Sequence, residues 1–151
     1  MKNFGSADEV LDFAITREEE AAQFYTELAK KMNRAWMQQV FEDFAKEEQG
    51  HKQKLLSVKQ GKRLLSAEKK VMDLKIGDYL VDVGPGEELD YQQALIVAMK
   101  KEKAAFRLYT DLSATTDDSN LQNLLLSLAQ EEAKHKLRFE LEYDEHFLAQ
   151  N

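Results

Sequence analysis

The 151-residue sequence contains no cysteine, and this absence excludes several kinds of site at once. Disulfide scaffolds, thiolate zinc sites, cysteine-held iron–sulfur clusters and cysteine nucleophiles all need that residue. Any bound metal must therefore be held by glutamate, aspartate or histidine. Proline occurs once and glycine six times. So few helix breakers exclude a collagen-like or Pro/Gly-rich disordered chain and favour an all-α fold.

Basic residues are also scarce, with 21 Lys and Arg against 28 Asp and Glu, a net charge of -7. Nucleic-acid-binding domains normally present a basic face, so no nucleic-acid partner is expected. No apolar run approaches the roughly 20 residues that span a bilayer, and the amino terminus lacks the apolar stretch of a signal peptide. We therefore expect a cytoplasmic protein that has no membrane partner.

The length fits a single domain over residues 1–151, and apolar residues recur at helical spacing in four segments. The pattern Ser6-x-x-Glu9 predicts a capping box at the first helix, and Asp117, Asp118 or Ser119 is expected to cap the last. The predicted helices span residues 6–32, 34–60, 88–114 and 118–148. Because the loops within each pair are short, each pair should fold back as an antiparallel hairpin.

Residues 61–87 break the helical pattern and form a long crossover between the second and third helices. Ser66 is expected to cap a short helical turn, Ile76–Val83 alternates like an extended segment, and Gly84-Pro85-Gly86 is a strong stop signal. Two antiparallel helix pairs joined by one long crossover predict a ferritin-like four-helix bundle.

The second half of the sequence repeats polar residues of the first half at a constant offset of 84 positions. Glu-x-x-His occurs in the second and fourth helices, and Glu followed seven residues later by Tyr occurs in the first and third. The matched pairs are Glu18 and Glu102, Tyr25 and Tyr109, Glu48 and Glu132, and His51 and His135.

Alternating steps of four and three residues place each repeated acid in the middle of the apolar stripe of its helix. An ionised carboxylate in an apolar core is very costly unless it is paired. Two divalent cations would balance four carboxylates, and Glu and His three residues apart lie on the same helix face. Di-iron and di-manganese carboxylate bundles use this kind of ligand set, with one Glu from each of two helices and Glu-x-x-His from each of the other two.

With these motifs, the chain resembles the ferritin-like superfamily, and within it the rubrerythrin family, over residues 6–148. The resemblance implies that Glu18 and Glu102 are terminal carboxylate ligands, that Glu48 and Glu132 are bridging ligands, and that His51 and His135 are nitrogen ligands. It also implies that Tyr25 and Tyr109 lie beside the ligands. Rubrerythrins usually carry a further carboxylate where this chain has Ala105, and a cysteine-ligated rubredoxin domain that this chain lacks.

The resemblance implies a di-iron oxidoreductase with two Fe ions per chain, or Mn in their place. Hydrogen peroxide or dioxygen would be reduced with electrons from an external donor such as a rubredoxin-like protein. Two alternatives stay open: a ferroxidase or iron-handling protein, and a metal-stabilised binding module without turnover. A homodimer is the expected oligomer, because it is the commonest soluble arrangement.

Several other polar and aromatic residues are interpreted as structural. Glu47 and Glu131 adjoin the proposed bridging residues but point about 100° away around the helix, which predicts surface acids. His146 is interpreted as a surface residue near the end of the last helix. Trp36 is interpreted as a packing residue or an oligomer contact.

Overall fold

A computed structural model of the chain describes residues 2–81 and 89–148. These residues form helices joined by loops and contain no strand, which confirms the all-α prediction. By its internal contacts the chain divides into two compact units, Asn3–Leu74, and Met1–Lys2 with Lys75–Asn151. The single domain over residues 1–151 stays a prediction.

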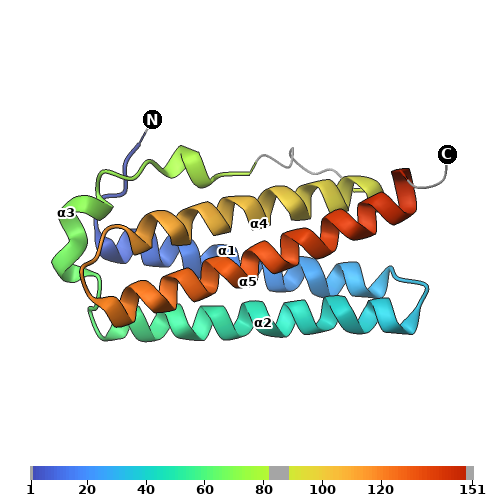
Figure 1. Cartoon of the computed structure of the whole chain (residues 1–151), viewed down its shortest axis with the longest axis horizontal. Coiled ribbons are helices and arrows are strands. Elements are labelled where there is room, and N and C mark those ends of the chain that lie inside the picture. Colours follow the sequence, from blue (N-terminus) through green and yellow to red (C-terminus); the bar gives the residue numbers. More distant parts are fainter. Residues whose placement is uncertain (1, 82–88, 149–151) are drawn as a thin grey trace. The chain divides into compact units, whose positions relative to one another are not determined.

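The unit Asn3–Leu74 is built on two long helices, α1 (Ala7–Lys30) and α2 (Ala35–Gln60). They lie side by side and run in opposite directions, as the short loop between them predicts (Figure 1). Ser6 caps α1 as expected, since its Oγ accepts a hydrogen bond from the Glu9 N–H at 3.0 Å. Glu9 reaches back one residue further than in a capping box and accepts from the Gly5 N–H at 3.1 Å.

The crossover begins in this unit with a 3-10 turn, η1 (Leu65–Ala67), and a short helix, α3 (Glu68–Val71). The expectation that Ser66 caps this helical turn is wrong: Ser66 lies inside η1, and α3 begins after Ala67 without a side-chain cap. The turn is held by a tertiary contact, because the Ala7 N–H donates to Glu68 Oε2 at 3.0 Å. This bond joins α3 to the first turn of α1.

In the other unit, the crossover continues as a 3-10 helix, η2 (Ile76–Tyr79), where an extended segment was predicted. Residues three apart share a side of a 3-10 helix, so Ile76 and Tyr79 face the same way. Tyr79 is buried, and its hydroxyl donates to Asp111 Oδ2 at 2.6 Å. Burial and the Asp111 carboxylate raise the pKa of Tyr79, which keeps the phenol protonated as a donor. The stop signal Gly84-Pro85-Gly86 lies outside the described residues.

This unit also contains a long helix pair, α4 (Tyr91–Ser113) and α5 (Ser119–Tyr143), which again lie side by side and antiparallel (Figure 1). Asp90 and Gln93 form a reciprocal capping box, so α4 starts three residues later than the sequence predicts. Asp118 is the N-cap of α5 and accepts from two backbone N–H groups of its first turn. A π-helix, η3 (Asp144–Leu148), follows α5 directly, and the helical conformation therefore reaches residue 148.

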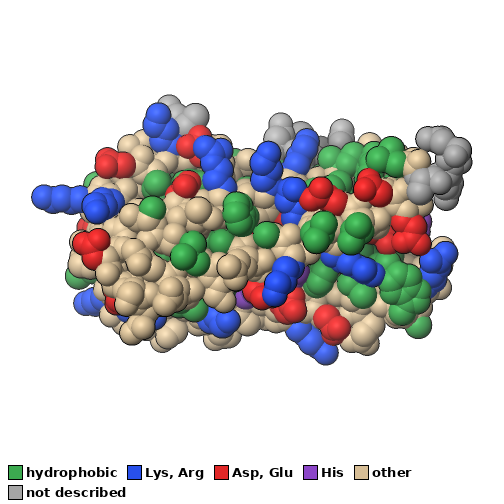
Figure 2. All heavy atoms as spheres, viewed as in Figure 1, with side chains coloured by type: hydrophobic (Ala, Val, Ile, Leu, Met, Phe, Trp, Pro, Cys, Tyr) green, Lys and Arg blue, Asp and Glu red, His purple; other side chains and the backbone are tan. Residues whose placement is uncertain are grey.

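The predicted apolar stripes are the buried faces of the four long helices. Phe44, Tyr91 and Ala105, which lie on these stripes, are half-buried. On the face drawn in Figure 2, charged side chains of both signs are interspersed with hydrophobic ones. Within the described part of the chain, no helix combines the length and apolar character that crossing a membrane requires.

Candidate metal centre

In the unit Asn3–Leu74, three of the predicted ligands meet between α1 and α2. His51 Nδ1 lies 3.3 Å from Glu48 Oε1, one turn earlier on α2, and 3.6 Å from Glu18 Oε2 on α1. One donor atom of each residue lies within 4.8 Å of those of the other two. All three side chains are buried, with Glu18 2% and Glu48 1% exposed. We call these three residues the first trio.

The other unit forms the corresponding second trio, Glu102 on α4 with Glu132 and His135 on α5. His135 Nδ1 lies 3.7 Å from Glu102 Oε2, and one donor atom of each residue again lies within 4.8 Å of the others. Each of the three residues is 1% exposed. The second half of the chain therefore repeats the first in geometry as well as in sequence.

The same atoms of the matched residues are shielded from solvent in both trios. They are Glu18 Oε2 and Glu102 Oε2, Glu48 Oε1 and Glu132 Oε1, and His51 Nδ1 and His135 Nδ1. Two ligands bonded to one ion at about 2.1 Å stand roughly 3.0 to 3.4 Å apart, close to the spacings within each trio. Buried carboxylate and imidazole donors at these spacings fit a metal site for a divalent ion.

The first trio also shifts the titration of its own histidine. Burial lowers the pKa of His51, but hydrogen bonds and charge interactions with Glu18 and Glu48 outweigh that effect and raise it to about 9. A metal-free trio therefore keeps a proton on His51 at neutral pH. A cation that binds the imidazole nitrogen must displace this proton.

The two predicted tyrosines are among the most deeply buried side chains, since Tyr25 is 0% and Tyr109 1% exposed. The ring of Tyr25 packs edge-on against Phe44 of α2, with ring centroids 6.2 Å apart. These positions agree with apolar packing around the trios. A direct role of either hydroxyl beside the ligands stays a prediction.

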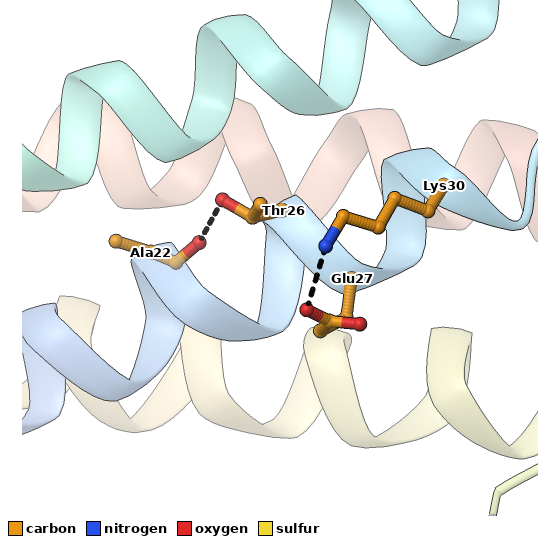
Figure 3. A network of polar contacts seen from close by, with 4 residues as sticks. All are labelled: Ala22, Thr26, Glu27 and Lys30. Carbon is orange, nitrogen blue, oxygen red and sulfur yellow. Dashed lines mark hydrogen bonds and ion pairs between the residues drawn. The ribbon is translucent and has the colours of Figure 1, made fainter.

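An open hollow of about 590 Å³ lies on the surface between α1 and α2. Its lining includes Ala22, one turn after Glu18, and Ala45, one turn before Glu48. Thr26, which also lines the hollow, donates to the Ala22 carbonyl oxygen at 2.8 Å, and Glu27 pairs with Lys30 at 3.2 Å (Figure 3). The hollow is thus lined in part by small residues that lie one helical turn from two members of the first trio.

The structure agrees with the interpretation of Glu47 and Glu131 as surface acids. Glu47 is exposed, and Glu131 is half-exposed and pairs with Lys134 at 3.2 Å. Trp36 is 48% exposed at the start of α2, and its role as a packing residue or an oligomer contact stays a prediction.

His146 is not an isolated surface residue. Its Nδ1 lies 3.1 Å from a buried carboxylate oxygen of Glu142. The four-residue spacing of Glu142 and His146 was the available sequence signal.

A comparison with protein-family models gives a match over nearly all of the helical chain. The Rubrerythrin family model matches residues 9–143, from the first turn of α1 to the end of α5. Neither the comparison with curated proteins nor that with solved structures gave a match. The matched range contains both trios and the crossover, and the chain belongs to the rubrerythrin family.

Proposed function

We propose that this protein is a di-iron oxidoreductase that reduces hydrogen peroxide, or dioxygen, with electrons from an external donor. The observation that carries the proposal is the repeated trio of two buried carboxylates and one imidazole. Ionised, each trio has two negative charges, which one divalent ion would balance. Two trios then account for two ions per chain. Membership of the rubrerythrin family favours iron, and manganese is a second candidate because oxygen and nitrogen donors accept both ions.

In this proposal the six ligand residues have the roles that the family resemblance implies. Glu18 and Glu102 would be terminal ligands, Glu48 and Glu132 would be the bridging carboxylates that the resemblance implies, and His51 and His135 would supply the nitrogen donors. Carboxylates can change their binding mode when the charge of an ion changes, whereas a set of imidazoles would favour one geometry. A carboxylate-rich site therefore suits an ion that alternates between two oxidation states.

Bound iron would supply the two electrons, one from each ion, that convert peroxide and two protons into two molecules of water. The residues of the chain would control water, orientation and protons around that chemistry. Buried apolar side chains keep bulk water from the donor atoms, and Tyr25 and Tyr109 would orient ligand carboxylates by hydrogen bonds. Because the chain has no cysteine for a rubredoxin-type centre, the electrons would come from another protein, such as a rubredoxin-like one, or from a small reductant.

The proposal is tested by multiple turnover. Protein loaded with Fe²⁺ is mixed anaerobically with hydrogen peroxide and excess reduced rubredoxin-type donor, and oxidation of the donor is followed by its absorbance. We expect many equivalents of donor to be oxidised per chain, and loss of this activity in Glu132→Ala. A single stoichiometric burst, with no further oxidation of the donor, would contradict peroxidase function.

One observation favours a second candidate, a ferroxidase. Ala105, half-buried one turn after Glu102, stands where rubrerythrins usually have a further carboxylate. A ferroxidase would oxidise far more than two Fe²⁺ per chain with dioxygen and keep the ferric product within a large assembly. A metal-stabilised binding module would bind metal but show neither reaction, so iron uptake and donor oxidation measured together separate the three candidates.

We also propose that the protein is a homodimer. Leu126, Leu137 and Leu141 of α5 are each more than 40% exposed, and their spacing places them on one side of the helix. Such a row would supply apolar surface to a second copy. Sedimentation equilibrium tests the proposal, with two chains expected and a monomer or a shell of many subunits contradicting it.

A further inference from the structure

The end of α5 and the π-helix that follows it carry a second group of potential metal ligands. One donor atom from each of Glu142, Glu145 and His146 lies within 4.8 Å of the others. Glu142 is buried at 3% exposed, His146 is half-buried and Glu145 is exposed. The group therefore has one ligand inside the protein and two that reach toward solvent, which gives an ion direct access.

The buried member of the group is held in place from the neighbouring helix. The Tyr91 hydroxyl of α4 donates to Glu142 Oε1 at 2.6 Å. The ring of Tyr91 also packs edge-on against the His146 ring, with centroids 5.8 Å apart. Hydrogen bonds from outside a metal site commonly fix ligand carboxylates in this way.

The donor atoms already have the spacing of two ligands on one ion. His146 Nδ1 lies 3.1 Å from Glu142 Oε1, within the roughly 3.0 to 3.4 Å expected for two metal bonds of about 2.1 Å. Both contacts of the Glu142 side chain fall on Oε1. The other oxygen of this nearly buried carboxylate, Oε2, takes part in neither of these two contacts.

The matched positions in the first half of the chain hold other residues, so a helix pair of this kind can form without Glu142 and His146. Eighty-four positions earlier, Glu142 corresponds to Val58, which is 0% exposed, and His146 corresponds to Lys62. A buried carboxylate costs free energy unless it is compensated, and in the second half alone Tyr91 and His146 supply contacts to such a carboxylate. The ligand group is a feature of the second half alone.

The group is also separate from the second trio. Glu142 lies seven residues after His135, which is about 10 Å along a helix. Phe139, between them on the same face, is 0% exposed and fills the space with an apolar ring. No ligand can therefore be shared between the two positions.

We infer that Glu142, Glu145 and His146 form a separate binding site for one divalent transition-metal cation of the Zn²⁺ or Fe²⁺ type. Imidazole together with carboxylates favours such ions over Mg²⁺ and Ca²⁺, which bind through oxygen alone. Three protein ligands leave further coordination positions to water. The site is open to solvent, and it exchanges its ion more readily than the enclosed trios do.

The test compares the number of Zn²⁺ ions bound per full-length chain by native protein and by variants, after dialysis against low micromolar Zn²⁺ and elemental analysis. His146→Lys introduces the residue found at the corresponding position of the first half. We expect it to bind one Zn²⁺ fewer than the native chain. Glu145→Gln, at an exposed position, is expected to raise the dissociation constant of that one ion at least about tenfold.

Asp144→Asn is the matched control, because it removes one acid from the same turn without removing a member of the ligand group. It should bind as many ions as the native chain. The inference is overturned if His146→Lys binds the native number, or if Asp144→Asn weakens binding as much as Glu145→Gln. Because the readout is a difference of one ion, it holds whether the trios bind two ions or none.

Discussion

Because folding raises the pKa of His51, we predict that the free energy of unfolding of the metal-free protein depends on pH. Histidine in the unfolded chain titrates near pH 6.5, whereas His51 beside Glu18 and Glu48 titrates at about 9. A pKa raised on folding stabilises the folded state while the group is protonated. The contribution is complete below pH 6.5 and is lost as the pH rises through about 9.

Its magnitude follows from the two pKa values. At about 1.4 kcal/mol for each pH unit between them, the protonated His51 contributes about 3 kcal/mol below pH 6.5. About 2 kcal/mol remains at pH 7.5, and almost nothing at pH 10. The side chain is buried, so water screens these interactions little.

The assay is urea unfolding of protein kept metal-free with a chelator, at pH 6.0, 7.5 and 10, for the native chain and for His51→Gln. Glutamine is uncharged throughout this range, and other titrating groups cancel in the difference between the two proteins. We expect the free-energy advantage of the native chain over the variant to fall by about 3 kcal/mol between pH 6.0 and 10. A difference that stays constant with pH would refute the proposed environment of His51.

Three further predictions concern other parts of the molecule. Glu48→Ala and Glu132→Ala should each abolish cooperative binding of two metal ions yet stay folded, because each removes a carboxylate whose burial is itself costly. Two tightly bound ions in either variant, counted by elemental analysis, would show that the bridging assignment is wrong. Tyr79→Phe should lower the free energy of unfolding by about 1.5 to 3 kcal/mol, since it removes a hydrogen bond to the Asp111 carboxylate, and a urea midpoint equal to the native one would contradict this. We also predict that peroxide enters through the hollow beside the first trio. Ala22→Phe, which introduces the bulk found at the matched position of the second half, should then leave the metal content unchanged but slow the appearance of ferric absorbance after a peroxide pulse. An unchanged rate would contradict this route.

The sequence predicted the long helices and the position of the acids because both depend on a local period. Steps of four and three residues follow directly from helix geometry, and so Glu18, Glu48, Glu102 and Glu132 could be placed on buried faces in advance. The structure buries all four. The offset of 84 residues then paired the two halves without any knowledge of their spatial arrangement.

The crossover was less predictable because its conformation depends on contacts between distant residues. The hydrogen bond from Tyr79 to Asp111, 32 positions away, anchors the 3-10 helix at Ile76–Tyr79. The alternation of apolar and polar residues along the segment does not reveal that hydrogen bond. The ligand group at Glu142 was missed although its spacing to His146 is visible in the sequence, because the burial of Glu142 depends on the fold. Only the fold shows that Tyr91, 51 positions earlier, orients this carboxylate.

The central claim, that the two trios hold two ions, is tested most directly by anaerobic titration of the metal-stripped protein with Fe²⁺. The titration is best carried out on His146→Lys, so that the site after α5 does not contribute. Bound iron per chain is counted, and near-ultraviolet absorbance is followed after a peroxide pulse. We predict a sharp break at two Fe²⁺ per chain and a rapid oxo-bridged ferric band. A titration without a break would contradict the claim and leave the six residues with no role in metal binding.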